Sequence, residues 1–236
     1  MPNSSGSSRL LLVRFIALIF MLSFMMPWLM ACEFITQIDA APDRTGFDVF
    51  DSPTNELRHT PANGGVLSAW FIDVGQGDCI FLESPSGKTM LIDSGENKYY
   101  DDINEFLTGR GAGALDVVIA THPHSDHIGT GDTIVRLYSP DRVYLLPYDD
   151  SYIYNTARLW DNLYVYDQLL TAVEETEGVT LIQHLNPGAA SAEEGSPDFA
   201  FGNFQIQIVN YEEDYLTSPK EDANQFCLGV IASAND

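Results

Sequence analysis

The stretch "ATHPHSDHIG", residues 120–129, places three of the chain's five histidines and one aspartate within six positions. The other 230 positions hold only two histidines, so a surface loop that is rich in histidine by chance explains the cluster poorly. Imidazole nitrogen and carboxylate oxygen are the ligand types that suit zinc and related divalent cations. Without a cation, each protonated imidazole would discourage protonation of the next. The stretch therefore predicts a metal site.

The residues around the cluster predict how it is presented. "LDVVIA" (115–120) is a short continuous apolar run, typical of a buried strand. Functional side chains in α/β folds gather on loops beyond the carboxyl ends of such strands. Pro123 disfavours an α conformation at His122, so we expect His122 and His124 on an extended loop. Asp126 and His127 would then lie where the next helix begins, and four donors could converge.

The rest of the chain alternates strand-like and helix-like patterns. An apolar period of helical spacing that ends at glycines follows the first three strands, and similar alternation continues towards the C-terminus. The pattern indicates an α/β fold with mixed strands. We expect helices at 99–113, 128–138 and 155–177, and strands at 66–74, 78–84, 89–94, 115–120, 142–146, 179–185, 199–210 and 226–232.

Three motifs resemble a known family. The segment 122–127, HPHSDH, resembles the HxHxDH signature of the metallo-β-lactamase superfamily, and "LIDSG" (91–95) matches the strand and turn that precede it there. More narrowly, "FIDVGQGDCIFLES" (71–84), "TMLIDSG" (89–95) and "LDVVIATHPHSDHIG" (115–129) look like the extracytoplasmic hydrolase domain of ComEC-type competence proteins. The resemblance is strong over residues 66–136 and holds only in outline beyond them.

The resemblance implies a four-layer αββα sandwich with one or two Zn²⁺ ions, or Mn²⁺ in their place, at one edge of the paired sheets. It assigns the first metal to His122 and His124 and the second to Asp126 and His127, with Asp126 also orienting the attacking water as a catalytic residue. The implied reaction is hydrolysis of an ester or phosphodiester. Three aspartates also come from the matching motifs. Asp78 and Asp93 are expected to hydrogen-bond the histidines, and the alternative for them and for Asp73 is an ordinary turn cap.

The chain departs from the family pattern in its C-terminal half. A third histidine for the first metal, a bridging aspartate on a later strand and a last histidine are absent in recognisable form. "NQFCLGVIA" (224–232) resembles the strand after which the remaining ligands normally follow, yet the sequence stops at Asp236. We therefore expect a fold truncated in its C-terminal half. The alternative to an enzyme is a catalytically impaired remnant, or a metal-binding module that retains the HxHxDH loop.

The first 32 residues have the composition of a targeting segment. Arg9 and Arg14 precede an almost wholly apolar run, residues 15–32, which ends in Leu29-Met30-Ala31-Cys32. This ending resembles the lipobox of bacterial lipoproteins, which implies cleavage before Cys32 and acylation of its sulfur; an uncleaved membrane-spanning helix is the alternative. We expect a signal peptide at 1–31, a flexible tether at 32–65 and a C-terminally incomplete metallo-β-lactamase-like domain at 66–236, exported and anchored on the extracytoplasmic side of the membrane.

The net charge of the chain limits which substrates it can bind. Eleven basic and 34 acidic residues give a formal net charge of −23, which repels polyanions. Nucleic acid is thus possible but disfavoured as a substrate, and a small ester or phosphodiester fits better. Of the remaining histidines, His59 is expected to be solvated in the tether and His184 to lie in the core or at a sheet edge. Whether Cys79 and Cys227 pair stays open at this point.

Overall fold

The computed structural model describes residues 56–59, 65–155, 159–212 and 217–234. The expected signal peptide, the lipid-attachment residue Cys32 and most of the expected tether lie outside these ranges. Within the described ranges, no helix is both long enough and apolar enough to cross a membrane.

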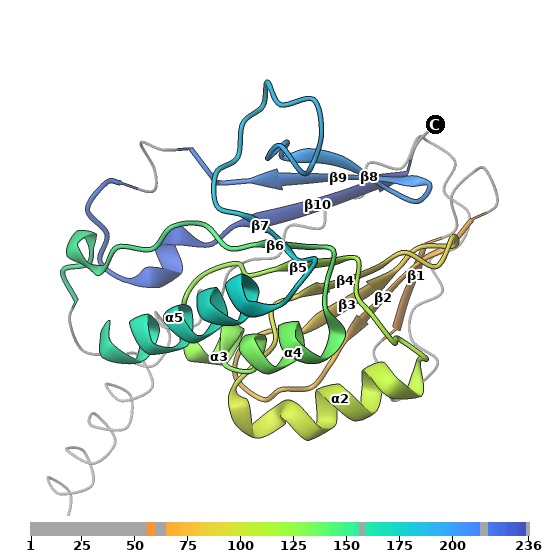
Figure 1. Ribbon diagram of the computed structural model, residues 1–236, viewed down its shortest axis with the longest axis horizontal. Helices are drawn as coiled ribbons and strands as arrows, with labels where there is room; N and C mark the ends of the chain where they lie inside the picture. The colour runs from red at the N-terminus through yellow and green to blue at the C-terminus, as the bar shows by residue number, and fades with distance from the viewer. Residues whose placement is uncertain (1–55, 60–64, 156–158, 213–216, 235–236) are drawn as a thin grey trace, which may run out of the picture. The chain divides into compact units, whose positions relative to one another are not determined.

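A seven-stranded mixed sheet forms the centre of the fold (Figure 1). Its strands follow one another in chain order from β1 to β7, antiparallel from β1 to β4 and parallel from β4 to β7. The carboxyl ends of the parallel strands therefore lie at one edge. The strands are β1 (Glu56–His59), β2 (Leu67–Phe71), β3 (Ile80–Glu83), β4 (Thr89–Ile92), β5 (Val117–Ile119), β6 (Arg142–Tyr144) and β7 (Thr180–Ile182).

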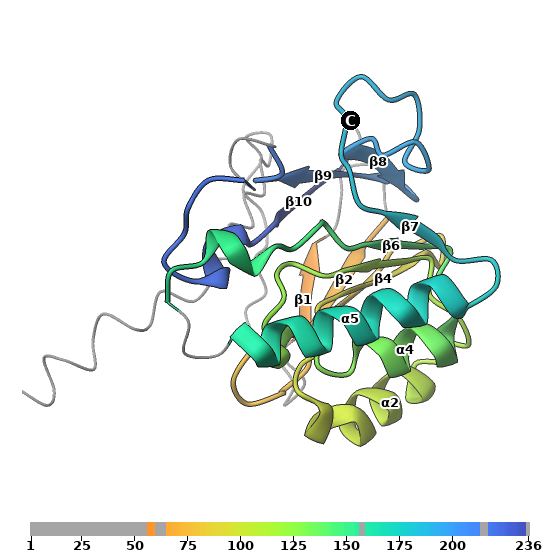
Figure 2. The ribbon, with the colours of Figure 1, turned by 60° about the vertical axis from the view of Figure 1, so that its left-hand side comes forward.

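Helices cover one face of this sheet and a second sheet covers the other (Figures 1 and 2). The second sheet has the order β10-β9-β8, with antiparallel pairs. The described residues thus supply helix, sheet and sheet layers, which confirms the predicted metallo-β-lactamase-like α/β class. The elements are α2 (Tyr100–Gly109), α3 (Ser125–Ile128), α4 (Gly131–Tyr138), α5 (Leu159–Glu175), β8 (Asp198–Phe201), β9 (Phe204–Val209) and β10 (Gly229–Ala234), with 3₁₀ turns η1 (Asn97–Tyr99), η2 (Asp150–Tyr152) and η3 (Ala223–Phe226).

The continuous apolar runs of the central strands follow from burial on both faces. Successive side chains of a strand point to opposite faces, so neighbours enter different cores. Phe81, Leu91 and Val118 pack with the helices, whereas Met90 and Val117 pack against the second sheet. Each fully buried side chain of this size contributes roughly 1.5–3 kcal/mol.

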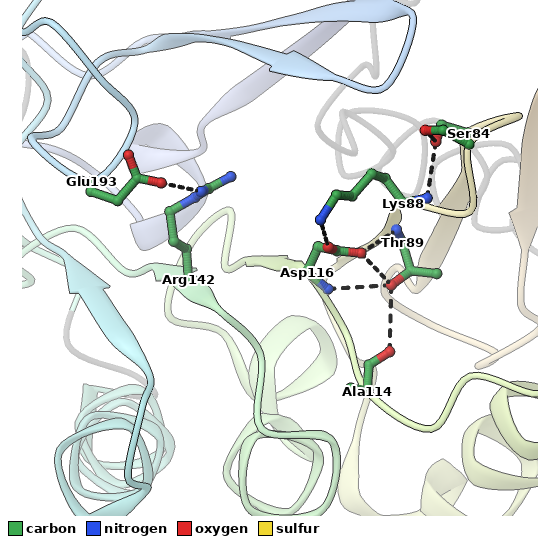
Figure 3. A network of polar contacts seen from close by, with 8 residues as sticks. Ser84, Lys88, Thr89, Ala114, Asp116, Arg142 and Glu193 are labelled. Atoms are coloured by element: carbon green, nitrogen blue, oxygen red, sulfur yellow. Dashed lines mark hydrogen bonds and ion pairs between the residues drawn. The ribbon is translucent and has the colours of Figure 1, made fainter.

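A polar network fixes the register of β4 and β5 at their amino ends (Figure 3). One carboxylate oxygen of Asp116 accepts hydrogen bonds from the Thr89 backbone N at 2.8 Å and from Thr89 Oγ1 at 3.1 Å. The other oxygen of Asp116 pairs with Lys88 Nζ. Burial opposes ionisation of Asp116, but the hydrogen bonds from Lys88 and Thr89 and the Lys88 charge outweigh it and hold the pKa of this carboxyl below its ordinary value.

Two boundaries differ from the expectation. Strand β1 lies inside the segment 32–65 expected to be a tether, where its backbone pairs antiparallel with β2; its four residues are too few to show a period in the sequence. The helix expected at 128–138 begins at Gly131 as α4, and Ile128 is the last residue of the separate short helix α3. The chain breaks between them because the Thr130 backbone N bonds to Gly95 O at 3.2 Å and its hydroxyl bonds to Ser94 O, outside the helix.

Cys79 forms no disulfide bond in this structure. Cys79 is a free thiol, 2% exposed, in the core between the central sheet and the helices. It therefore does not pair with Cys227. Burial raises the pKa of the Cys79 thiol well above its ordinary value, and the nearby charges of Asp93 and Asp78 add to this effect. A buried neutral thiol of this kind acts as a small apolar side chain.

Candidate metal centre

The histidine loop leaves the sheet at the carboxyl end of β5, beside the end of β4. Ile92 and Ile119 are register partners in these parallel strands, so the residues that follow them are neighbours. The Thr121 backbone N donates to Asp93 Oδ1 at 2.8 Å. On its other side, Thr121 O accepts from the Leu228 backbone N at 2.9 Å. The loop is therefore held between the central sheet and the chain that leads into β10.

Three imidazole rings converge at the end of this loop. The ring centroid of His122 lies 4.8 Å from that of His124 and 4.0 Å from that of His127. His124 has an extended backbone, with φ −80° and ψ 144°, and is the N-cap residue of α3. His127 is in that helix, so the two halves of the HxHxDH segment approach each other where the loop turns into the helix. The arrangement is the one expected from Pro123 and the helix start.

His122 has a buried nitrogen with no hydrogen-bond partner among the described residues. Its side chain is 4% exposed, its Nδ1 lies 3.0 Å from Thr121 Oγ1, and its Nε2 is unpartnered. Burial, together with the charges of His127 and His124, outweighs the opposing contact with the Asn224 side chain and holds the pKa of His122 well below its ordinary value. A neutral imidazole with an open, buried Nε2 is the form that binds a metal ion.

His127 is oriented by carboxylates. Its Nδ1 lies 2.7 Å from Asp93 Oδ2 and 3.7 Å from Asp78 Oδ2. Burial opposes the charged form of His127, but its hydrogen bond to Asp93 and the charges of Asp93, Asp126 and Asp78 outweigh it and raise the pKa of His127. With Nδ1 occupied by Asp93, Nε2 is the nitrogen left for a cation. Such carboxylate–imidazole pairs fix the ring and increase its basicity as a ligand.

Asp93 joins the elements of the centre. Beyond its bonds to the Thr121 backbone and His127, its Oδ2 accepts from Thr121 Oγ1 at 2.6 Å. The residue is 2% exposed and adopts a left-handed backbone, with φ 57°. Each of Asp93, His122 and His127 offers one ligand atom, and these atoms all lie within 4.8 Å of one another. Because its oxygens already accept three hydrogen bonds, Asp93 acts here as an anchor for the imidazoles.

The turn between β2 and β3 packs against α3. Gln76 Nε2 donates to Asp126 Oδ2 at 2.8 Å, and Asp126 is 8% exposed. A Cβ atom on Gly77 would lie 1.8 Å from Asp126 O, so only glycine allows this approach. The motif that contains "GQGD" (75–78) therefore serves the site by holding Asp126 in place. Burial raises the pKa of Asp78, which lies in the same turn. The charge of His127 opposes this rise, and the charges of Asp93 and Asp126 add to it.

These donors fit a divalent cation. The unpartnered Nε2 of His122 is a buried polar atom that would cost free energy if nothing contacted it. The imidazoles of His124 and His127 and the buried carboxylate of Asp93 lie near the ring of His122, and together they are the donor chemistry of zinc and manganese sites. The histidines of the 122–127 segment are the residues that would hold the ion.

A family model provides independent evidence. The model of the metallo-beta-lactamase superfamily matches residues 72–197, more than half of the 236 residues and the whole of the site described so far. The chain belongs to the metallo-beta-lactamase superfamily. The chain is also similar to ComE operon protein 3 of Bacillus subtilis (strain 168), with 30% identity over 89 residues, which cover 30% of this chain. The chain spans only 12% of the length of that relative.

Parts of solved structures are also similar to this chain. One is a metallo-beta-lactamase from Cronobacter sakazakii, with a TM-score of 0.40, 13% identity, and coverage of 60% of this chain and 49% of that chain. Another is the flavodiiron protein from Giardia intestinalis, with a TM-score of 0.38, 10% identity, and coverage of 72% of this chain and 30% of that chain.

Of the other aspartates and the histidine considered from the sequence, some lie at the site of this metallo-beta-lactamase domain and others lie outside it. Asp73 is exposed and its Oδ1 accepts from the Gly75 backbone N at 3.0 Å, so it caps a turn, the alternative considered for it. Asp93, and at longer range Asp78, contact His127. His184, expected in the core or at a sheet edge, is instead exposed after β7 because that strand ends at Ile182.

Three residues of the site were not singled out from the sequence. Thr121 and Gln76 hydrogen-bond Asp93 and Asp126, and both stand inside the quoted motifs, so their position was a usable signal. The third is Asp222, whose Oδ1 lies 3.4 Å from His124 Nε2. It comes from the connection between β9 and β10, nearly a hundred residues from the histidines, and no local pattern marks it.

Proposed function

We propose that this chain is an exported, metal-dependent hydrolase that acts on phosphodiester or other ester bonds. The observation that carries the proposal is the buried, unpartnered Nε2 of His122 at the convergence of three imidazoles. His122, His124 and His127 would bind the ion or ions, with Asp126 as a further ligand. A bound zinc ion lowers the pKa of its water to about 7 and stabilises negative charge that develops on the substrate.

The residues of this chain supply orientation for that chemistry. Asp126 has one oxygen held by Gln76, so its other oxygen is available to orient the attacking water or accept its proton. Asp93 fixes the ring of His127, and Thr121 fixes that of His122. Burial of these groups excludes competing water from the imidazole nitrogens. The result is a set of donors arranged before substrate binds, which is what electrostatic catalysis requires.

The test is hydrolysis by the purified full-length chain loaded with Zn²⁺ or Mn²⁺. Bis-p-nitrophenyl phosphate and p-nitrophenyl acetate separate phosphodiester from carboxyl-ester turnover. We expect His122→Ala to abolish turnover and Asp126→Asn to reduce kcat by roughly 10²–10⁴-fold. His184→Ala, which removes an exposed histidine outside the site, is the matched control and should leave turnover unchanged. Equal turnover in wild type and His122→Ala would refute the proposal.

A metal-binding module without turnover is the second candidate. The observation that favours it is the small cavity beside His122, about 20 Å³, lined by Pro123, Leu145, Tyr148, Tyr166 and Phe226 among others. A cavity of this volume holds about one water molecule. Tight metal binding that depends on His122, together with no hydrolysis of either ester, would favour the module over the enzyme.

We propose further that the protein is anchored to the outside of a membrane through lipid on Cys32. The basic-then-apolar segment and the sequence from Leu29 to Cys32 support this proposal. Metabolic labelling with a fatty acid in the expression host should label the wild type but not Cys32→Ser. Label of equal intensity in both would contradict lipid attachment at this residue. Because of the net charge of −23, we favour a small anionic or neutral ester over nucleic acid as the substrate.

A further inference from the structure

Asp222 reaches the metal centre from the connection between β9 and β10. Its Oδ1 lies 3.4 Å from Nε2 of His124. The segment that carries Asp222 is tied to the chain after β6 by backbone hydrogen bonds: Lys220 N to Tyr152 O at 2.8 Å, Tyr154 N to Lys220 O at 3.0 Å, and Asn155 N to Glu221 O at 3.1 Å. The carboxylate is therefore held at the histidine loop by structure that belongs to neither α3 nor β5.

The separation of the two atoms is longer than that of a short hydrogen bond. A charge-assisted hydrogen bond between imidazole and carboxylate has a length of about 2.7–2.9 Å, well short of the 3.4 Å seen here. Two ligands that share a tetrahedral zinc ion at about 2.0–2.1 Å have donor atoms about 3.3–3.4 Å apart. The 3.4 Å between His124 Nε2 and Asp222 Oδ1 therefore suits two ligands of one zinc ion as well as a direct ion pair.

A second observation points to the same ligand. The unpartnered Nε2 of His122, 4% exposed, belongs to the ring that is 4.8 Å from the ring of His124. The β9–β10 connection, which carries Asp222, also lies beside His122. Its Leu228 N donates to Thr121 O, and its Phe226 lines the cavity beside His122. The β9–β10 connection thus contacts His124 through Asp222 and the His122 side of the loop through Phe226 and Leu228.

We infer that Asp222 is a metal ligand that shares a cation with His122 and His124. The inference rests on the metal centre proposed above and adds one anionic donor to it. It gives a role to a residue outside the HxHxDH segment and outside residues 72–197 matched by the family model. Because a carboxylate is a harder donor than imidazole, Asp222 also makes the site more accepting of Mn²⁺.

The test is metal titration of the full-length chain after removal of metal with a chelator, with Co²⁺ absorption as the spectroscopic signal and Zn²⁺ added in competition. The variant is Asp222→Asn, because asparagine keeps the cap that Asp222 provides to η3, where it accepts from the Asn224 backbone N at 2.9 Å. The matched control is Asp149→Asn. Asp149 caps η2 in the same way, accepting from the Ser151 backbone N at 2.8 Å.

We expect Asp222→Asn to weaken Zn²⁺ binding at least ~10-fold, to change the Co²⁺ spectrum at saturation, and to weaken Mn²⁺ binding more than Zn²⁺ binding. Asp149→Asn should match the wild type. Should Asp222→Asn not fold, Asp222→Ser, which also caps η3, is judged by the same criteria. Unchanged affinity, or an unchanged saturated spectrum, in either variant would overturn the assignment of Asp222 as a ligand.

Inclusion of His122→Ala separates this inference from the proposed function. Loss of metal in His122→Ala with wild-type behaviour of Asp222→Asn overturns only the role of Asp222. Wild-type metal binding in His122→Ala overturns both the role of Asp222 and the metal centre itself.

Discussion

At the scale of single residues, Asp93 decides which nitrogen of His127 is free. Its carboxylate accepts from Thr121 N, from Thr121 Oγ1 and from the ring of His127, so each oxygen is engaged. The left-handed backbone at φ 57° is a conformation that aspartate and asparagine tolerate better than other side chains. The residue therefore combines a strained backbone with a fixed set of acceptors, as positioning residues near active sites commonly do.

Asp93→Asn tests this positioning role. We expect a folded protein, because asparagine accepts the left-handed backbone, with zinc affinity lowered roughly 10–100-fold because one carboxylate oxygen becomes an NH₂ group that cannot accept from His127. Isothermal titration with Zn²⁺ measures the change. Asp73→Asn, in an exposed turn cap, is the control. An unchanged affinity in Asp93→Asn would show that His127 needs no carboxylate partner.

Residue chemistry could be predicted from the sequence only where it is local. The four donors at 122, 124, 126 and 127 stand in one short segment, and Asp93 stands in a motif with a recognisable strand before it. Asp222 is different, because its place beside His124 depends on how the β9–β10 connection folds back onto η2 and the β5 loop. No spacing along the chain encodes that contact.

At the scale of elements, the β2–β3 turn and α3 fit together through a glycine. Gly77 has φ +96° and no room for a side chain, because a Cβ would lie 1.8 Å from Asp126 O. Gly87 has a similar φ of +82°, but a Cβ atom added at Gly87 would have no other atom within 4 Å. A substitution at Gly87 therefore measures only the free-energy cost of a positive φ, whereas the same substitution at Gly77 adds the cost of the contact with Asp126.

Gly77→Ala and Gly87→Ala should therefore differ in stability. Alanine in the left-handed region costs about 1 kcal/mol at either position. At Gly77 the displaced backbone of Asp126 adds an overpacking cost, so we expect at least ~2 kcal/mol more destabilisation than at Gly87. Urea unfolding of the two variants gives the difference. Equal free energies of unfolding would mean that the turn does not press against α3.

The contact between β4 and β5 at their amino ends has a pH dependence with a definite sign. The pKa of Asp116 is lower in the folded state than its ordinary value of 3.8. The stability that its ionised form contributes is therefore complete above that value and is lost as the pH falls through the lower folded pKa. Asp116→Ala also leaves the Thr89 backbone N without its acceptor, which costs about 1–2 kcal/mol near neutral pH.

Urea unfolding at about pH 6 and about pH 2.5 tests this account. We expect the difference in free energy of unfolding between wild type and Asp116→Ala to shrink at the lower pH. Asp167→Ala, at an exposed position of α5, should change stability by less than ~0.5 kcal/mol at both pH values. A difference that grows on acidification would contradict a lowered pKa of Asp116 in the folded state.

Elements could be predicted from the sequence where apolar runs mark them and less well at their ends. The runs at 80–82, 90–92 and 117–119 are apolar throughout because both faces of the sheet are covered. The break between α3 and α4 depends instead on hydrogen bonds from Thr130 to the turn after β4, which is distant in sequence. Strand β1 depends on pairing with β2 rather than on any pattern of its own.

At the scale of the whole molecule, the metal centre joins the carboxyl edge of the central sheet to the chain that enters the second sheet. Asp93 follows β4, the histidines follow β5, and Asp222 precedes β10. A cation bound there would bind only the folded chain, so it should stabilise the molecule by mass action, about 2.7 kcal/mol at a free ion concentration 100 times Kd. Sequence motifs predicted the fold class and the histidine cluster, whereas this joining of the two sheets required the structure.

The most direct measurement is the metal content of the purified full-length chain, determined by atomic emission after equilibration with Zn²⁺ and removal of free ion. The account predicts one or two zinc ions per chain in the wild type and loss of at least one in His122→Ala, with His184→Ala unchanged. A wild-type chain that retains no zinc, or a His122→Ala variant that retains as much as the wild type, would contradict it.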